Sequence, residues 1–319
     1  MIYQNATAAP RQELSEYVME SATNNGMFIG VEILPPSPLK LPTGHYPKIK
    51  VSTGDLMRAA QATRSPGAGF HRWQADVEDG SLTLLQVGEE LQVPDEQEML
   101  YEDYFSLEQV FSLEAKNRVQ RQHELLVEAA IFNTSATTFD AVTSSVAYTT
   151  GNYSTLSLIA DVIAAIRRVK ARGELPNTII IPGLVWDVVR LGTLVQNFIA
   201  GANQPGAVVT DTTLQRGFEP YGIKNVYIAD AYVNQSVAND NSIINPIWPK
   251  TYVWVGAVAP GALQAGGVGR TYYWEKEGPL FNVSSYRDET KKSNIIRCMT
   301  TSQAAIVNYR AGTLITTQA

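Results

Sequence analysis

The chain has 319 residues, 45% of them hydrophobic and 18% charged, so it can bury one large core or two modest ones. It carries 25 Lys and Arg residues against 31 Asp and Glu residues, and this net charge of −6 argues against a protein that grips duplex nucleic acid over a broad face. The single cysteine, Cys298, excludes an intramolecular disulfide and a multi-cysteine metal site, and we interpret it as a small buried residue of a strand.

The N-terminal residues 1–33 predict an arm with one polar-rich helix from Gln12 to Met19. They contain neither a basic leader with an apolar core nor enough apolar residues to cover a core, so we expect cytosolic synthesis and an arm that packs on something else. No run of about 18 apolar residues occurs in the chain, so no membrane contact is expected. A proline-rich turn follows from Leu34 to Gly44, where missing N–H groups and a fixed φ exclude a helix.

The next stretch of the chain predicts an extended hairpin. Pro47–Val51 and Ser81–Val93 both alternate apolar and polar residues, as the two arms of a long hairpin would. Ala62–Trp73 contains a Ser-Pro-Gly-Ala-Gly run and suits an exposed tip. Because so little core material seldom stands alone, we expect this hairpin to find its partner on another subunit.

Tyr101–Phe132 predicts one long amphipathic helix, around which the rest of the chain is organised. Ser106 is the expected N-cap, and Gln109 can complete a capping box. The predicted buried face consists of Leu107, Val110, Phe111, Ala115, Val119, Leu126, Ala129 and Ala130. The predicted solvent face carries Glu108, Glu114, Lys116, Arg118, Arg121, Glu124 and Glu128.

An alternating α/β pattern follows a short strand and loop within Thr134–Thr150. A helix is predicted over Ser157–Arg172, closed by Gly173 in the left-handed conformation. A buried strand is predicted at Ile179–Ile181 and a second helix at Trp186–Ala200, with Trp186 as an interior anchor. The remaining predictions are polar turns at Gly201–Gly206 and Thr210–Gly217 and a strand at Asn225–Ile228.

The final third predicts strands and turns throughout, with Arg287–Ser293 as a charged hairpin tip between two long arms. No internal repeat of 20 to 50 residues is found, which argues against a solenoid or propeller.

Catalytic motifs are missing from the sequence: it has no Gly-x-Ser-x-Gly elbow, no phosphate-binding loop and no His-Glu-x-x-His. The histidines, His45, His71 and His123, are scattered, and His123 is interpreted as a solvated residue of a polar helix face. Gly266–Gly269 mimics half a dinucleotide fingerprint, but no helix follows, so a turn is expected. We interpret the paired acids Glu89-Glu90 and Asp95-Glu96 as solvated loop charge. No catalytic, cofactor-binding or metal-ligating residue is predicted, and no cofactor.

The order of elements resembles the major capsid proteins of tailed bacteriophages of the Hong Kong 97 type. Three parts of the sequence carry the resemblance. The first is Arg64–Ala68 and Val93–Glu96, which flank the extended loop, and the second is Pro176–Ile181 followed by Val185-Trp186. The third is the C-terminal stretch from Tyr286–Glu289 through Ala311–Ile315. The resemblance implies an α+β fold with a long spine helix, an α/β axial domain, an extended β-hairpin loop and an N-terminal arm. The implied domains are the arm (1–33), the extension loop (34–100), a peripheral domain with the spine helix (101–150), the axial domain (151–261) and returning peripheral strands (262–319).

The resemblance also implies a function, which is to self-assemble into pentamers and hexamers of an icosahedral virion shell that encloses double-stranded DNA without sequence-specific binding. A separate scaffolding protein, a portal protein and decoration or cement proteins are the implied partners, and no activity as an enzyme is expected. Lys40, Lys48 and Lys50 lie near the base of the loop, away from its tip, and give no warrant for the lysine crosslinks of some members. Two alternatives remain open, an encapsulin-like shell of a cellular nanocompartment and a soluble α/β enzyme with an unrecognised site.

Overall fold

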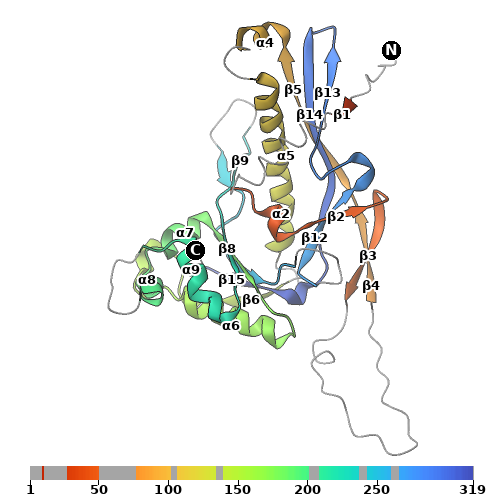
Figure 1. Cartoon of the computed structure of the whole chain (residues 1–319). Coiled ribbons are helices and arrows are strands. Elements are labelled where there is room, and N and C mark those ends of the chain that lie inside the picture. Colours follow the sequence, from red (N-terminus) through yellow and green to blue (C-terminus); the bar gives the residue numbers. More distant parts are fainter. Residues whose placement is uncertain are drawn as a thin grey trace, which may run out of the picture.

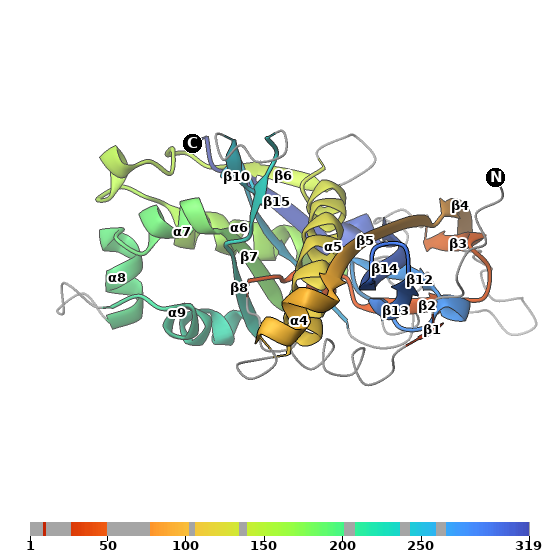
Figure 2. The ribbon, with the colours of Figure 1, turned by 90° about the horizontal axis from the view of Figure 1, so that it is seen from above.

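A long helix, α5 (Leu107–Ile131), lies between two sheets in the computed structural model of the chain (Figures 1 and 2). The structure describes residues 9–10, 27–49, 77–101, 106–133, 139–200, 208–236, 243–259 and 266–318. The expected helix at Gln12–Met19, the loop tip at Ala62–Trp73 and the turn at Gly201–Gly206 lie outside the described residues.

The helix α5 begins at the N-cap expected from the sequence. Ser106 has an extended backbone, and its Oγ accepts a hydrogen bond from the Gln109 N–H. Because this cap starts the helix, the expectation of one helix from Tyr101 is wrong at its N-terminal end: Tyr101 ends a separate short helix, α4 (Asp95–Tyr101). The 25 residues of α5 span roughly 38 Å at the usual rise per residue.

The first sheet is centred on the longest strand, β14, which α5 covers together with β5. Its order is β1 (Ala9–Pro10), β13 (Asn282–Asp288), β14 (Ser293–Ile306), β12 (Gly269–Trp274) and β2 (Pro36–Leu39), with β5 (Leu85–Pro94) paired to β14. The β13–β14 hairpin turns between Asp288 and Ser293, which confirms the predicted charged tip. The core under the N-terminal half of α5 includes Val93, Val119, Ile296 and Cys298, so the buried-strand interpretation of Cys298 is confirmed.

The predicted hairpin forms, but with a shorter second arm. β3 (Thr43–Ile49) pairs with β4 (Val77–Thr83) in an antiparallel ribbon, with Thr43 opposite Thr83. The expected single strand Ser81–Val93 is interrupted at Leu84, which lies in one buried cluster with Leu82 and Tyr272. Beyond Leu84 the chain continues as β5 and pairs with β14 instead of β3.

The second sheet has the order β6 (Asp140–Thr143), β15 (Gly312–Thr316), β11 (Tyr252–Gly256), β7 (Thr178–Pro182) and β8 (Asn225–Ala229). The buried strand predicted at Ile179–Ile181 and the strand at Asn225–Ile228 are confirmed. Ile179 and Ile181 face one core, whereas Ile180 faces another that contains the C-terminal end of α5. Both faces of the sheet are thus covered, which explains why β7 reads as an uninterrupted apolar run.

Four helices pack beside the second sheet: α6 (Leu158–Ala171), α7 (Gly183–Val189), α8 (Thr193–Ala200) and α9 (Asp211–Phe218). α6 matches its prediction, and Gly173 has the expected positive φ of 85°. The expected single helix Trp186–Ala200 is wrong, because the chain leaves α7 at Arg190 and restarts as α8 after Gly192. A Cβ on Gly192 would lie 3.1 Å from the Val189 carbonyl oxygen, so this break favours glycine.

The turn expected at Thr210–Gly217 is also wrong, since these residues begin and fill α9. The Thr210 hydroxyl accepts from the Thr213 N–H at 3.2 Å, and the Thr213 hydroxyl accepts from the Thr210 N–H at 2.8 Å. This reciprocal cap outweighs the turn-like composition of the segment. The remaining elements are a short helix α2 (Gly30–Ile33) and a hairpin of β9 (Tyr232–Asn234) and β10 (Ile244–Pro246).

Trp186 lies in the core of the second sheet, as predicted, with 8% of its surface exposed. We expect Trp186→Ala to lower the free energy of unfolding by about 3–5 kcal/mol, because the truncation leaves a cavity. Leu184→Ala on the same helix is the matched control: Leu184 is 40% exposed, and its truncation should cost about 0.5 kcal/mol or less. Urea unfolding of the two variants measures both values, and equal losses would contradict the placement of Trp186.

Candidate functional site

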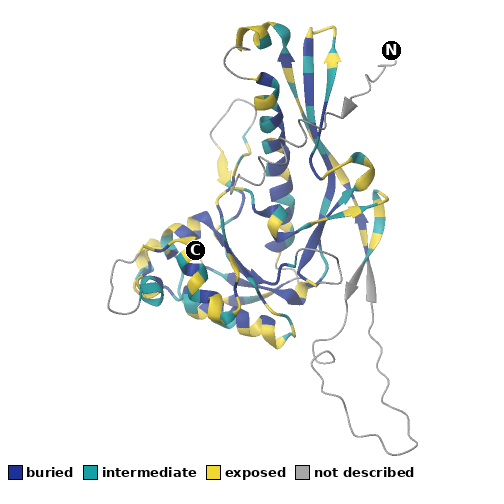
Figure 3. Ribbon diagram, in the orientation of Figure 1, coloured by how far each residue is buried: buried dark blue, intermediate teal, exposed yellow. Residues whose placement is uncertain are grey.

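The side of α5 that faces the rest of the molecule carries a row of buried polar residues, which we call the polar row. It consists of Ser112, Lys116, Gln120, His123 and Glu124, each no more than 5% exposed. The expectations that Lys116 and Glu124 lie on a solvent face and that His123 is solvated are therefore wrong. The reason is tertiary: the sheet, the N-terminal segment and Trp248 cover this side of α5. Arg118 and Gln122 are exposed on another side of the helix, and Figure 3 shows buried and exposed residues alternating along it.

Glu124 is the centre of the polar row, because its carboxylate accepts three hydrogen bonds from two distant segments. Oε2 accepts from the Gly30 N–H at 2.8 Å, and Oε1 accepts from the Ile29 N–H at 3.2 Å and from the indole Nε1 of Trp248 at 2.8 Å. Burial raises the pKa of Glu124, whereas the three donors oppose that rise. The carboxylate thus supplies the cap that α2 lacks from its own N-cap residue, Ile29.

Gly30 makes this contact possible because it has no side chain. A Cβ at this position would lie 2.6 Å from Glu124 Oε2 and within 3.3 Å of Val127 and His123. Trp248 is fully buried on the other side of the carboxylate and packs edge-on against Phe132, with ring centroids 5.1 Å apart. Residues at the end of the predicted arm are therefore part of the core.

His123 is held in its neutral form by burial. Its Nε2 lies 3.2 Å from the Thr271 hydroxyl, and its ring meets Phe281 edge-on at 5.8 Å. Burial lowers the pKa of His123 to about 4. At neutral pH the ring is an uncharged packing group that makes one polar contact with β12.

Lys116 and Cys298 are neighbours in the same interior, where α5 covers β14. Burial lowers the pKa of Lys116 to about 8 and raises the pKa of the Cys298 thiol to about 12. The thiol therefore stays protonated at neutral pH, so it is a poor nucleophile and a poor metal ligand.

The paired acids Glu89 and Glu90, beside the N-terminal half of α5, do not lie in a loop. Glu89 and Glu90 are on β5: Glu89 accepts from Arg118 of α5 at 2.8 Å, and Glu90 pairs with Arg297 of β14 at 2.5 Å. The interpretation as solvated loop charge is wrong for these two residues. Because such ion pairs are half exposed, they contribute little stability but fix the register of β5 against its neighbours.

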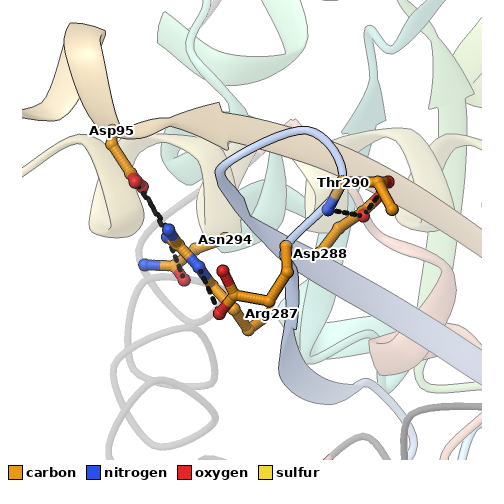
Figure 4. A network of polar contacts seen from close by, with 6 residues as sticks. Asp95, Arg287, Asp288, Thr290 and Asn294 are labelled. Carbon is orange, nitrogen blue, oxygen red and sulfur yellow. Dashed lines mark hydrogen bonds and ion pairs between the residues drawn. The ribbon is translucent and has the colours of Figure 1, made fainter.

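Asp95, at the start of α4, makes the third of these ion pairs (Figure 4). Its two carboxylate oxygens accept from Arg287 at 2.5 and 2.6 Å, and Arg287 also reaches the Asn294 side chain at 3.3 Å. The guanidinium holds the pKa of Asp95 below its usual range. The loop-charge interpretation thus fails for Asp95 as well, since the residue ties α4 to the β13–β14 hairpin.

A second buried polar cluster anchors the loop before α6, and sequence reasoning missed it. Asp161 Oδ2 accepts from the hydroxyls of Ser144, Ser157 and Tyr148 at 2.7, 2.7 and 2.8 Å. Burial, the largest cause, and the adjacent Asp161 charge raise the pKa of the Tyr148 phenol, so it remains a donor. The spacing of Ser157 and Asp161, four residues apart at a helix start, was the available signal.

The remaining sequence candidates do not assemble into a reactive site. His45 is exposed on β3, and His71 lies outside the described residues. Gly266 and Gly267 have φ of 77° and 96° and form the predicted turn before β12. Across the described ranges no three His, Cys, Asp or Glu side chains gather to hold a metal ion, and no helix is long and apolar enough to cross a membrane.

No protein-family model and no curated protein matches the sequence. Solved structures do match. A phage-related protein from Bordetella bronchiseptica RB50 superposes with a TM-score of 0.69 at 17% identity over 98% of each chain. The capsid of cyanophage P-SCSP1u gives a TM-score of 0.57 at 10% identity over 89% of this chain and 86% of that one. The chain has a phage-capsid fold.

A third solved structure widens the range of this fold. The virus-like particle from Pyrococcus furiosus matches with a TM-score of 0.59 at 10% identity over 95% of this chain and 98% of that one. Glu124 and the Asp161 cluster hold segments of the subunit together, because their carboxylates accept hydrogen bonds from other segments in the interior. The candidate functional surfaces are therefore the exposed ends of the molecule.

The position of Glu124 leads to a prediction about stability. Glu124→Gln keeps the shape but turns one amide NH₂ toward backbone or indole donors, so we expect a loss of about 2 kcal/mol in the free energy of unfolding. Glu128→Gln, one turn further on, is the matched control. Burial raises the pKa of Glu128 to about 7, so its neutral replacement should leave stability at pH 8 unchanged or higher. Urea unfolding at pH 8 compares the two, and equal losses would contradict the role of Glu124.

His123 and Glu128 predict a pH dependence of opposite signs. The His123 pKa of about 4 in the folded chain lies below the ordinary 6.5, so stability falls as the pH drops through this window. The Glu128 pKa of about 7 lies above the ordinary 4.5, so its contribution is lost as the pH rises through 7. The two effects largely cancel between pH 4.5 and 6.5 in the natural chain.

Glu128→Gln removes one of the two opposing effects, so the pH dependence caused by His123 should become measurable in this variant. We expect the free energy of unfolding of this variant to fall by up to about 3 kcal/mol between pH 7 and 4 because of His123. The control is the double variant Glu128→Gln/His123→Gln, in which all other titrating groups, Glu124 included, are the same. Denaturant unfolding at several pH values gives the difference between the two variants, and parallel pH profiles would refute the assignment.

Proposed function

We propose that the chain is a major capsid protein that assembles through pentamers and hexamers into the icosahedral head of a tailed bacteriophage. The head would enclose double-stranded DNA, and a separate scaffolding protein, a portal protein and decoration or cement proteins would be its partners. The observation that carries this proposal is the agreement of fold over 98% of both chains with the Bordetella phage-related protein.

The β3–β4 ribbon supports the proposal from the structure. Within the described residues, β3 and β4 pair only with each other, and the ribbon projects from the body of the molecule (Figure 1). Isolated two-stranded ribbons are marginal in water, and their open edges accept further strands. A neighbouring subunit in a shell would supply the missing cover.

The net charge of −6 fits a container for DNA. Packaged DNA must move past the inner surface, and a strongly basic surface would retain it through its phosphates. An acidic chain encloses the duplex without sequence-specific binding.

Electron microscopy of native particles tests the function. We expect closed shells of several hundred subunits filled with DNA. Small shells that are empty or filled with an enzyme would instead indicate a cellular nanocompartment, and small discrete oligomers would indicate a soluble enzyme.

Deleting Ala62–Trp73 tests the ribbon's part in assembly. The deleted residues lie outside the described part of the chain, and the ribbon base needs no more than a short replacement turn. We expect a folded subunit with the melting temperature of the natural chain that builds no closed shells, because a strand-donating loop could bury about 800 Å² on each partner. Gel filtration and microscopy provide the readout. Normal particles from the deletion variant would contradict a role of this loop in assembly.

A further inference from the structure

The short helix α4, before the N-terminus of α5, buries none of its own side chains against the described part of the chain. None of its seven residues is buried, and its last turn exposes Met99 by 78% and Leu100 by 66%. Tyr101, the last residue of α4, and Val110, in the first turn of α5, add two further large apolar side chains that are at least 40% exposed. We call these four residues the α4 patch. Figure 3 shows α4 as largely exposed beside the tip of the β13–β14 hairpin.

A helix of this length is not stable by itself, so something other than its own packing holds it. Its N-terminus is tied to the hairpin by the two-pronged Asp95–Arg287 pair and by the Asp95 N–H, which donates to the Lys292 carbonyl at 3.2 Å. Lys292 adopts a φ of 46°, a conformation that costs free energy in a residue other than glycine. The hairpin thus presents α4 in a fixed position with its apolar end turned to solvent.

Charge is distributed unevenly over this end of the molecule. Glu96 and Glu98 precede Met99 on α4, and in the described part of the chain neither makes an ion pair. Lys291 and Lys292 are exposed at the adjacent hairpin tip and likewise make no ion pair with a described residue. The α4 surface is apolar with acidic residues, whereas the hairpin tip carries Lys291 and Lys292 together with Asp288 and the exposed Glu289.

We propose that the α4 patch docks on a second copy of this chain, against the hairpin tip that carries Lys291 and Lys292. In this contact α4 of one copy meets the hairpin of the next. A direct contact between two α4 patches would bring the acidic residues of both copies together, which disfavours it. This inference rests on the proposed shell function only in requiring that copies of the chain meet.

Other occupants fit the surface less well. A nucleic acid or an anionic membrane would be repelled by Glu96 and Glu98 next to the exposed apolar side chains. A second copy carries both members of the complementary pair, so each additional copy satisfies one surface and offers another. Met99, Leu100 and Tyr101 are large apolar residues that are exposed in succession along α4, and exposed apolar patches mark interaction sites.

Crosslinking between two differently tagged proteins tests the contact directly. One carries Met99→Cys and the other Lys291→Cys, and the mixture is assembled and treated with a bis-maleimide reagent. The natural Cys298 is fully buried and does not compete. The control pairs Met99→Cys with Leu175→Cys, because Leu175 is 75% exposed but lies beside the second sheet. We expect a crosslinked pair carrying both tags from the first mixture and none from the control.

Charge reversal gives an independent readout. Glu96→Lys/Glu98→Lys and Lys291→Glu/Lys292→Glu should each abolish assembly, whereas the chain with all four substitutions should assemble again. The subunit of each variant should stay folded at the temperature of assembly, which its melting curve checks, although Lys292→Glu places a carboxylate near Asp95. If the fourfold variant fails to assemble while its subunit is folded at that temperature, the proposed docking is wrong.

The outcomes separate this inference from the proposed function. Closed shells of the natural chain without the Met99–Lys291 crosslink would overturn the docking and leave the shell function standing. Small discrete oligomers that do give the crosslink would overturn the shell function and leave the docking standing.

Discussion

The structure depends on one buried carboxylate. Glu124 joins α5 to the segment before α2 and to Trp248, which lie 94 and 124 residues away in the sequence. An isolated charge in a protein interior is very costly, so Glu124 is tolerable only when all three donors are in place. Its donors come from the start of α2 and from Trp248, between β10 and β11, so both segments must be in place before the middle of α5 is satisfied. This requirement couples the parts of the subunit to one another.

The polar row also limits how α5 can sit on its sheet. A purely apolar face could slide or rotate by a turn at little cost, because one apolar contact replaces another. His123 opposite Thr271, Lys116 beside Cys298 and Glu124 at the N-terminus of α2 each accept one position only. We interpret the row as a device that fixes the register of a long rod at some expense in stability, a use of buried polar groups known from other helical interfaces.

Sequence rules that use only neighbouring residues correctly predicted the elements whose ends depend on those residues alone. The Ser106 cap, the Gly173 terminator of α6 and the apolar strand β7 each follow from a few neighbouring residues. The wrong predictions concern features that depend on segments far away in the sequence. Single-helix periodicity assigned His123 and Glu124 to solvent, because nothing in their own turn reveals that α2 and Trp248 cover them. The split after Thr83 likewise depends on the competition between β3 and β14 for the same strand, which the alternation of residues cannot show.

The two kinds of polar contact in the subunit suit different tasks. Inside, Glu124 and Asp161 are satisfied by donors that water cannot replace, so these contacts break only when the fold opens. At the far end, Glu89, Glu90 and Asp95 pair with arginines across surface that is still half exposed, where water can take over either partner at little cost. The buried contacts of Glu124 and Asp161 therefore hold the interior together, whereas the exposed ion pairs of Glu89, Glu90 and Asp95 position β5 and α4 at the surface.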